Sequence, residues 1–288
     1  MSFLTVRHAT VYRYSEPVGL GEHRMMFRPR ESHDLRLIRT SLAITPEPVQ
    51  LRWLHDPFDN SIAVAAFQGT TCELRFESTV TLEHFESTVP EYPIEDSAKT
   101  YPFRYSDEDF SNLARGLANH YPSIQTSSWA LQFLDPDTTT GTLKILRSMT
   151  RGIRDQFVYA RRIEKGVQSP EETLRKRRGS CRDFAVLMME AARSLGIAAR
   201  FVSGYIFLPN NSDGIGGGNT HAWMQAYLPG AGWIDFDPTN SIVGNRNLIR
   251  VGVAWTPDQV VPLCGTYEGS VEAFKSMDVT VTVTEAAG

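Results

Sequence analysis

The order of strand-like and helix-like segments constrains this fold more than any other feature of the sequence. The first third holds four runs rich in β-branched and aromatic residues with approximate alternation, which is typical of strands. Helical patterns follow from Ser106 to Gly196, and strand patterns return from Ala199. This succession predicts an α+β protein. The four N-terminal runs are residues 5–14, 35–44, 61–67 and 71–82.

A stretch rich in proline and tyrosine divides the chain between residues 87 and 105. It shows no helix or strand period and is typical of an extended linker. The strands before it, separated by Pro and Asn/Asp clusters, predict an antiparallel β-sandwich-like domain. After it we expect helices packed on an antiparallel sheet. The predicted division is a β domain over 1–88, a linker over 89–105 and a second domain over 106–288.

Composition excludes several classes of function. The 288 residues carry a net charge of −4, which gives no general attraction to nucleic acid. The short basic run at 175–178 is interpreted as a solvated helix face. No stretch approaches the roughly 18 apolar residues of a membrane span. Three cysteines cannot all pair and no leader pattern follows Met1, so we predict a reduced, cytoplasmic protein.

Cys181 lies where a reactive thiol is expected. Gly179 and Ser180 precede it, and the apolar run at 184–195 predicts a helix. Ser180 can cap this helix while Asp183 reaches back in a capping box, which puts the thiol in the first turn. Unpaired backbone N–H groups and the helix dipole favour a thiolate there. We therefore predict that Cys181 is a nucleophile.

Two later strands supply the groups that a cysteine nucleophile requires. His221 starts the first of them, after a glycine-rich loop at 214–218. On the second strand, Asp235 and Asp237 project to one face because side chains alternate. Pro238 ends that strand and places Asp237 at its rim. We predict His221 as the general base and Asp237 as the acid that orients it, with Asp235 behind them or in solvent.

These motifs resemble the core of the transglutaminase-like superfamily of papain-type cysteine enzymes. The matching patterns are Gly-x-Cys at a helix start, Thr-His-Ala-Trp on a strand and Trp-x-x-x-Asp-Pro-Thr. Segments 8–14, 28–30 and 56–60 are similar to the β domain of bacterial transglutaminase-like cysteine proteases. The resemblance implies a papain-like, transglutaminase-like catalytic core in which Cys181, His221 and Asp237 form the triad.

The expected activity is hydrolysis of an amide or peptide through a thioester acyl-enzyme. Transfer of the acyl group requires a site that binds an amine and excludes water, and the sequence displays none. Two alternatives stay open. One is transglutaminase-type acyl transfer, giving crosslinking or deamidation, and the other is an inactive binding scaffold.

Further expectations concern the groups around the thiol. The backbone N–H of Cys181 is predicted to be one oxyanion donor, and Tyr159, Ser180 and Trp223 are candidates for substrate binding or a second donor. The sequence shows no metal-ligand spacing, and residues 135–146 depart from a calcium loop, so no metal and no cofactor are expected. The expected partner is a peptide or protein substrate, with no nucleic acid and no membrane. The oligomeric state is left open.

Overall fold

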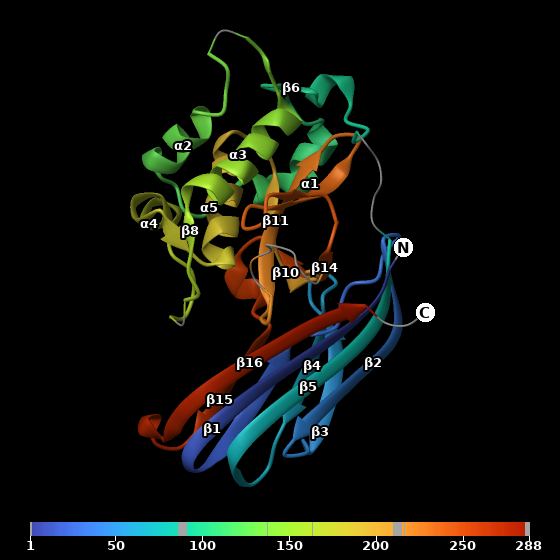
Figure 1. Ribbon diagram of the computed structural model, residues 1–288, viewed down its shortest axis with the longest axis vertical. Coiled ribbons are helices and arrows are strands. Elements are labelled where there is room, and N and C mark those ends of the chain that lie inside the picture. Colours follow the sequence, from blue (N-terminus) through green and yellow to red (C-terminus); the bar gives the residue numbers. More distant parts are fainter. Residues whose placement is uncertain are drawn as a thin grey trace.

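The structure, a computed structural model, consists of two parts stacked along the long axis of the molecule (Figure 1). One part is a long antiparallel sheet, and the other is a group of helices packed on a second sheet. The structure describes residues 2–85, 91–136, 138–162, 164–209, 215 and 217–285. Within these residues, no helix is both long and apolar enough to cross a membrane.

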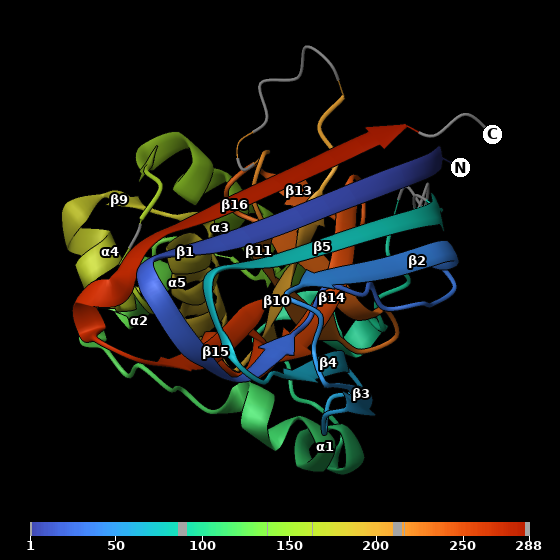
Figure 2. The same cartoon turned by 90° about the horizontal axis from the view of Figure 1, so that it is seen from below.

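The first part is one curled sheet of seven antiparallel strands, built around the long strand β1 (Ser2–Met25). Leu4, Val6, His8 and Thr10 of β1 are buried and alternate with more exposed neighbours, because one face of the strand packs against the second part of the molecule. Figure 2 shows β16, β1, β5 and β2 side by side in that order. The other strands are β2 (Leu35–Thr45), β3 (Gln50–His55), β4 (Ser61–Ala66), β5 (Thr70–His84), β15 (Leu263–Glu268) and β16 (Phe274–Glu285).

The predicted α+β class and N-terminal antiparallel sheet are confirmed, but the division into domains needs a correction. The expected second domain extended to residue 288, whereas β15 and β16 pair with β1 and complete the first sheet. The alternation of Val and Thr near the C-terminus correctly indicates a strand. Periodicity does not name the partner of a strand, and this partner lies at the opposite end of the sequence. Of the expected linker, residues 89 and 90 fall outside the described residues.

The second part is a five-stranded antiparallel sheet in the order β13-β12-β11-β10-β14, covered by helices. Its strands are β10 (Ala199–Ile206), β11 (His221–Leu228), β12 (Gly232–Asp237), β13 (Ile242–Val243) and β14 (Leu248–Ala254). The helices are α1 (Asp107–Leu117), α2 (Ile124–Leu131), α3 (Thr142–Gln156), α4 (Pro170–Lys176) and α5 (Cys181–Ser194). Short pieces are β6 (Thr100–Tyr101), β7 (Thr140–Gly141), β8 (Val158–Tyr159), β9 (Arg178–Gly179), η1 (Asp96–Ala98), η2 (Pro257–Val260) and η3 (Val271–Ala273).

Helix α5 is the centre of the second part. It is buried along nearly its whole length and packs against β11, α2 and α4. Its run of Ala, Leu and Met favours a helix, and the chain leaves it at Gly196, which has φ +72. Glu190 and Arg193 are buried as an ion pair at 2.6 Å. Arg193 also donates hydrogen bonds to three backbone carbonyls, which compensates for removing its charge from water.

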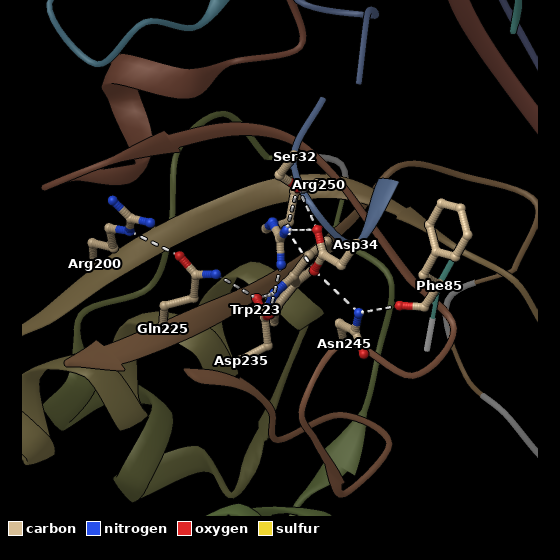
Figure 3. A network of polar contacts seen from close by, with 9 residues as sticks. All are labelled: Ser32, Asp34, Phe85, Arg200, Trp223, Gln225, Asp235, Asn245 and Arg250. Atoms are coloured by element: carbon tan, nitrogen blue, oxygen red, sulfur yellow. Dashed lines mark hydrogen bonds and ion pairs between the residues drawn. The ribbon is translucent and has the colours of Figure 1, made fainter. Parts of the chain in front are cut away.

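Polar side chains join the two parts of the molecule. Arg250 of β14 donates to Asp34, which follows β1, at 2.7 Å and to Asp235 of β12 at 3.0 Å (Figure 3). Asn60, next to β4, donates to the Val253 carbonyl at 2.8 Å and accepts from the Val253 N–H at 2.9 Å. These contacts fix the sheet of the second part against the first because each buried polar group finds its partner across the boundary.

A buried histidine lies at the same boundary. The Nδ1 atom of His8, on β1, is 2.9 Å from the Tyr205 hydroxyl of β10, and its Nε2 is 3.1 Å from the Thr10 hydroxyl. The ring packs against Phe27 with 4.1 Å between ring centroids. Burial lowers the pKa of His8 to about 4. His8 is therefore neutral in the folded protein at pH values where an unfolded histidine is already protonated.

This difference predicts a loss of stability in mild acid. As the pH falls from about 6.5 to about 4, the unfolded chain takes up a proton at His8 and the folded chain does not, which costs on the order of 3 kcal/mol of unfolding free energy. His8→Asn removes this contribution. Urea denaturation should show the variant less stable than the wild type at pH 7, with the difference shrinking toward pH 4. A difference that stays constant across this range would contradict the assignment.

Candidate active site

The start of α5 is held by a buried carboxylate. Asp183 has no exposed surface and accepts hydrogen bonds from the Ser180 N–H at 2.8 Å and the Ser180 hydroxyl at 2.9 Å. It also accepts from the Gln168 N–H at 2.7 Å and from Arg162 at 2.8 Å. Cys181 is therefore the first residue of a fixed helix, and its side chain remains 7 % exposed. The backbone N–H groups of the first turn of a helix have no partner within the helix.

His221 and Asp237 come from neighbouring strands. His221 begins β11 and Asp237 ends β12, and the antiparallel pairing of these strands brings the two residues to the same end of the sheet. The Nε2 atom of His221 lies 2.8 Å from Oδ2 of Asp237, and both side chains are fully buried. Within the described residues, Nδ1 of His221 has no hydrogen-bond partner.

Electrostatics in this pair favour a charged imidazole. Burial by itself would lower the pKa of His221, but the Asp237 carboxylate and the Cys181 thiol raise it to about 10. Burial raises the pKa of Asp237 and His221 lowers it, with the net shift downward. The Asp237 carboxylate thus favours the charged form of His221.

Asn240 is a site residue that the sequence patterns did not reveal. Its Nδ2 donates to Asp237 at 2.8 Å and to the Ile215 carbonyl at 2.9 Å, while its Oδ1 accepts from the Ile215 N–H at 2.6 Å. The Thr239 N–H also donates to Asp237, at 2.8 Å. Asn240 therefore connects Asp237 to the segment before β11. The turn after Asp-Pro-Thr was the available signal, but a turn asparagine is too common to indicate a site.

Asp235 is buried behind the pair and is not in solvent. It accepts from the Trp223 indole at 2.6 Å, from the Gln225 amide at 2.8 Å and from Arg250 at 3.0 Å (Figure 3). The Trp223 ring stacks on His221 with 5.9 Å between centroids. The network of Figure 3 thus extends from Asp34, in the first part of the molecule, to the ring that packs on the imidazole.

The three other candidates differ in their surroundings. The Ser180 hydroxyl donates to Asp183, and the Trp223 indole N–H donates to Asp235, so both donors are already engaged. Tyr159 pairs with Gly179 across β8 and β9. Burial and the nearby Cys181 raise the pKa of Tyr159 to about 12. Among the described residues, its hydroxyl has no hydrogen-bond partner.

The expected glycine-rich loop and the surroundings of the site lie only partly within the described residues. In the expected glycine-rich loop, residues 214 and 216 lie outside the described residues, and the Gly218 carbonyl accepts from the Val281 N–H of β16 at 3.0 Å. In the described part of the chain, no three His, Cys, Asp or Glu side chains gather as a metal-binding group. The chemistry available to the described site is that of a thiol, an imidazole and a carboxylate.

Comparisons with known proteins match two regions of this chain. Residues 4–83 match the bacterial transglutaminase-like N-terminal region, and residues 129–238 match the transglutaminase-like superfamily. An uncharacterized protein of Mycobacterium leprae is 39% identical over 119 residues, a match that spans 40% of this chain and only 41% of that protein. An uncharacterized protein of Mycobacterium tuberculosis is 27% identical over 90% of this chain and 86% of its own length.

A solved structure has the same fold. It is described as "a Putative Cysteine Protease from Cytophaga hutchinsonii", covers 100% of this chain and 91% of its own, and superposes with a TM-score of 0.72 at 19% identity. The two sequence matches together cover most of β1 to β5, the helix that begins at Cys181 and the strands that carry His221 and Asp237. These matches place residues 129–238 in the transglutaminase-like superfamily and residues 4–83 in the N-terminal region of its bacterial members.

Proposed function

We propose that this protein is a cysteine-dependent amide or peptide hydrolase that works through a thioester acyl-enzyme. The observation that carries the proposal is the buried contact of His221 with Asp237 beside the thiol at the start of α5. A buried charged pair is costly unless its charges are used or fully compensated. Here one nitrogen of His221 is compensated by Asp237, and the other is left for Cys181.

In the proposed reaction the Cys181 sulfur attacks the carbonyl carbon of the substrate, and the carbonyl π electrons move to oxygen. The oxyanion accepts hydrogen bonds from the Cys181 backbone N–H and from the Tyr159 hydroxyl. As the tetrahedral intermediate collapses, the C–N bond breaks and the amine leaves with the proton of His221. The acyl group is then a thioester on Cys181.

Water resolves this thioester in the second half of the reaction. His221, now neutral, takes a proton from water, and the resulting hydroxide attacks the thioester carbonyl. The C–S bond breaks, the carboxylic acid leaves and the imidazolium and thiolate return. Hydrolysis is the proposed outcome because water needs no binding site of its own, whereas acyl transfer requires a bound amine and exclusion of water.

The reactivity of Cys181 tests the proposed nucleophile. Cys72 and Cys264 are exposed, so alkylation is measured in a Cys72→Ser/Cys264→Ser protein. Iodoacetamide should label Cys181 rapidly well below pH 8, because His221 supports the thiolate, and His221→Ala should lose this advantage. Labelling that rises only near the ordinary thiol pKa of about 8.5 in both proteins would rule out the catalytic thiol.

The fate of the acyl group separates hydrolysis from transfer. The protein is incubated with a glutamine-containing peptide and a fluorescent primary amine, and products are identified by mass spectrometry. We expect cleavage of the peptide with no amine incorporated. Stable fluorescence in the peptide would overturn hydrolysis in favour of transglutaminase-type transfer, with Cys181→Ser as the blank for both reactions.

Substitution of Asp237 tests how His221 is held. In Asp237→Asn, kcat/KM should fall by about 10²- to 10⁴-fold because the imidazole loses its orienting charge. Burial then dominates and lowers the pKa of His221, so the alkaline limb of the pH profile should move to lower pH. Asn240→Ala should give a smaller loss, and exposed Asp155→Asn should change neither quantity. An unchanged pH profile in Asp237→Asn would exclude the proposed pairing.

A further inference from the structure

The segment that leads to the thiol is strongly basic in an acidic protein. The whole chain has a net charge of −4, but residues 159–182 have eight basic and three acidic residues, a net charge of +5. The basic residues are Arg161, Arg162, Lys165, Arg175, Lys176, Arg177, Arg178 and Arg182, and the acidic ones are Glu164, Glu171 and Glu172. Such an asymmetry creates a local positive potential.

The pairing of β8 with β9 brings this segment next to Cys181. β8 and β9 pair in parallel, with the Val158 N–H donating to the Arg177 carbonyl at 2.9 Å and the Ala160 N–H donating to the Gly179 carbonyl at 2.8 Å. Residues 158–161 therefore lie beside the residues that immediately precede the thiol. Arg161 continues from β8 and Arg178 belongs to β9, while Arg182 follows Cys181 in the first turn of α5.

Several of the cations have structural partners. Arg162 pairs with Asp183 at 2.8 Å, and Lys176 pairs with Glu172 at 2.5 Å. Arg177 donates to Gln156 and lies over the Phe157 ring. Arg175 and Lys176 occupy the last turn of α4, where cations favour the helix dipole. The interpretation of residues 175–178 as a helix face thus holds only for the first two.

Three arginines have no such explanation. Arg161 and Arg178 are exposed and Arg182 is half-buried, and none of them makes an ion pair within the part of the chain that the structure describes. We call Arg161, Arg178 and Arg182 the basic rim. A local excess of positive charge attracts an anionic ligand. Arg161 lies two residues after Tyr159 of β8, and Arg182 directly follows Cys181 in α5, so the backbone places both beside the residue that carries the thiol.

We infer that the acyl donor is an acidic peptide whose carboxylate, close to the scissile amide, is bound by the basic rim. Guanidinium groups bind carboxylates with paired, charge-assisted hydrogen bonds, and a substrate held at Arg161 and Arg182 presents its amide to the neighbouring Cys181. This inference rests on the proposed function, because it names the substrate class of that same thiol.

Charged alkylating reagents test the rim without a known substrate. Iodoacetate carries a carboxylate and iodoacetamide does not. The ratio of their alkylation rates, measured in the Cys72→Ser/Cys264→Ser protein, therefore reports the electrostatic potential at Cys181. At low salt, the ratio of the iodoacetate rate to the iodoacetamide rate should be about five- to tenfold higher for Cys181 than for a small free thiol. In 0.5 M salt this ratio should fall toward the free-thiol value. Mapping the Cys181 peptide by mass spectrometry in the wild type gives the same ratio without the serine substitutions.

Matched variants assign the effect to the rim. Arg161→Gln and Arg182→Gln should each reduce the iodoacetate preference, and Arg39→Gln, an exposed arginine on the distant strand β2, should not. The iodoacetamide rate of each variant is measured in parallel, so that the preference is expressed as a ratio, and it should be unchanged in Arg39→Gln. An equal loss in Arg39→Gln would show a general charge effect and overturn the inference.

Peptide amides test the substrate class directly. A peptide with Glu next to the cleaved amide should have about tenfold higher kcat/KM than its Gln counterpart, and Arg161→Gln and Arg182→Gln should remove the difference. If Cys181 reacts with iodoacetamide in a His221-dependent manner but shows no preference for iodoacetate or Glu, the rim assignment fails and the hydrolase proposal stands. If Cys181 is inert to both reagents, the proposed function fails. Protection of Cys181 by an oligonucleotide and not by the acidic peptide would also overturn the inference.

Discussion

The carboxylate of Asp183 is the contact on which the site depends most. It has no exposed surface, and it gathers donors from the turn before α5, from the loop after β8 and from Arg162. A single buried charge with this many partners fixes where the helix begins and, with it, the direction of the first N–H groups. Because Arg162 is bound by the same carboxylate, the strand that carries Tyr159 and the helix that carries Cys181 are held by one anchor.

Two aspartates two residues apart on β12 do different work because their neighbours differ. Asp237 is paired with His221, while Asp235 accepts hydrogen bonds from the Trp223 indole, the Gln225 amide and Arg250. Arg250 in turn binds Asp34 from the other part of the molecule. The β domain is thereby connected by hydrogen bonds and one ring contact to the imidazole itself, rather than lying apart as a separate module.

The sequence was sufficient for the features that local chemistry determines. Gly179, Ser180 and Asp183 correctly predicted the start of a helix. Alternation on β12 correctly placed the two aspartates on the opposite face from Ile234 and Phe236, which are buried in the core. What it could not supply depends on contacts between distant segments. The burial of Asp235 requires Arg250, the role of Asn240 requires the backbone of Ile215, and the partner of β16 is a strand from the other end of the chain. Periodicity describes one segment at a time and does not carry this information.

The pairing of β1 with β16 also has a consequence for the order in which the protein forms. The register runs from Leu4 opposite Glu285 to Tyr14 opposite Phe274, so one side of β1 has no partner until the entire helical part has been synthesised. Closing so long a loop is entropically costly for an unfolded chain. A folded second part shortens the effective loop, because it holds the entry at α1 and the exit after η2 in fixed positions. The nascent β domain thus exposes a long strand edge during translation, and β16 can cover this edge only after the part carrying the thiol has been synthesised.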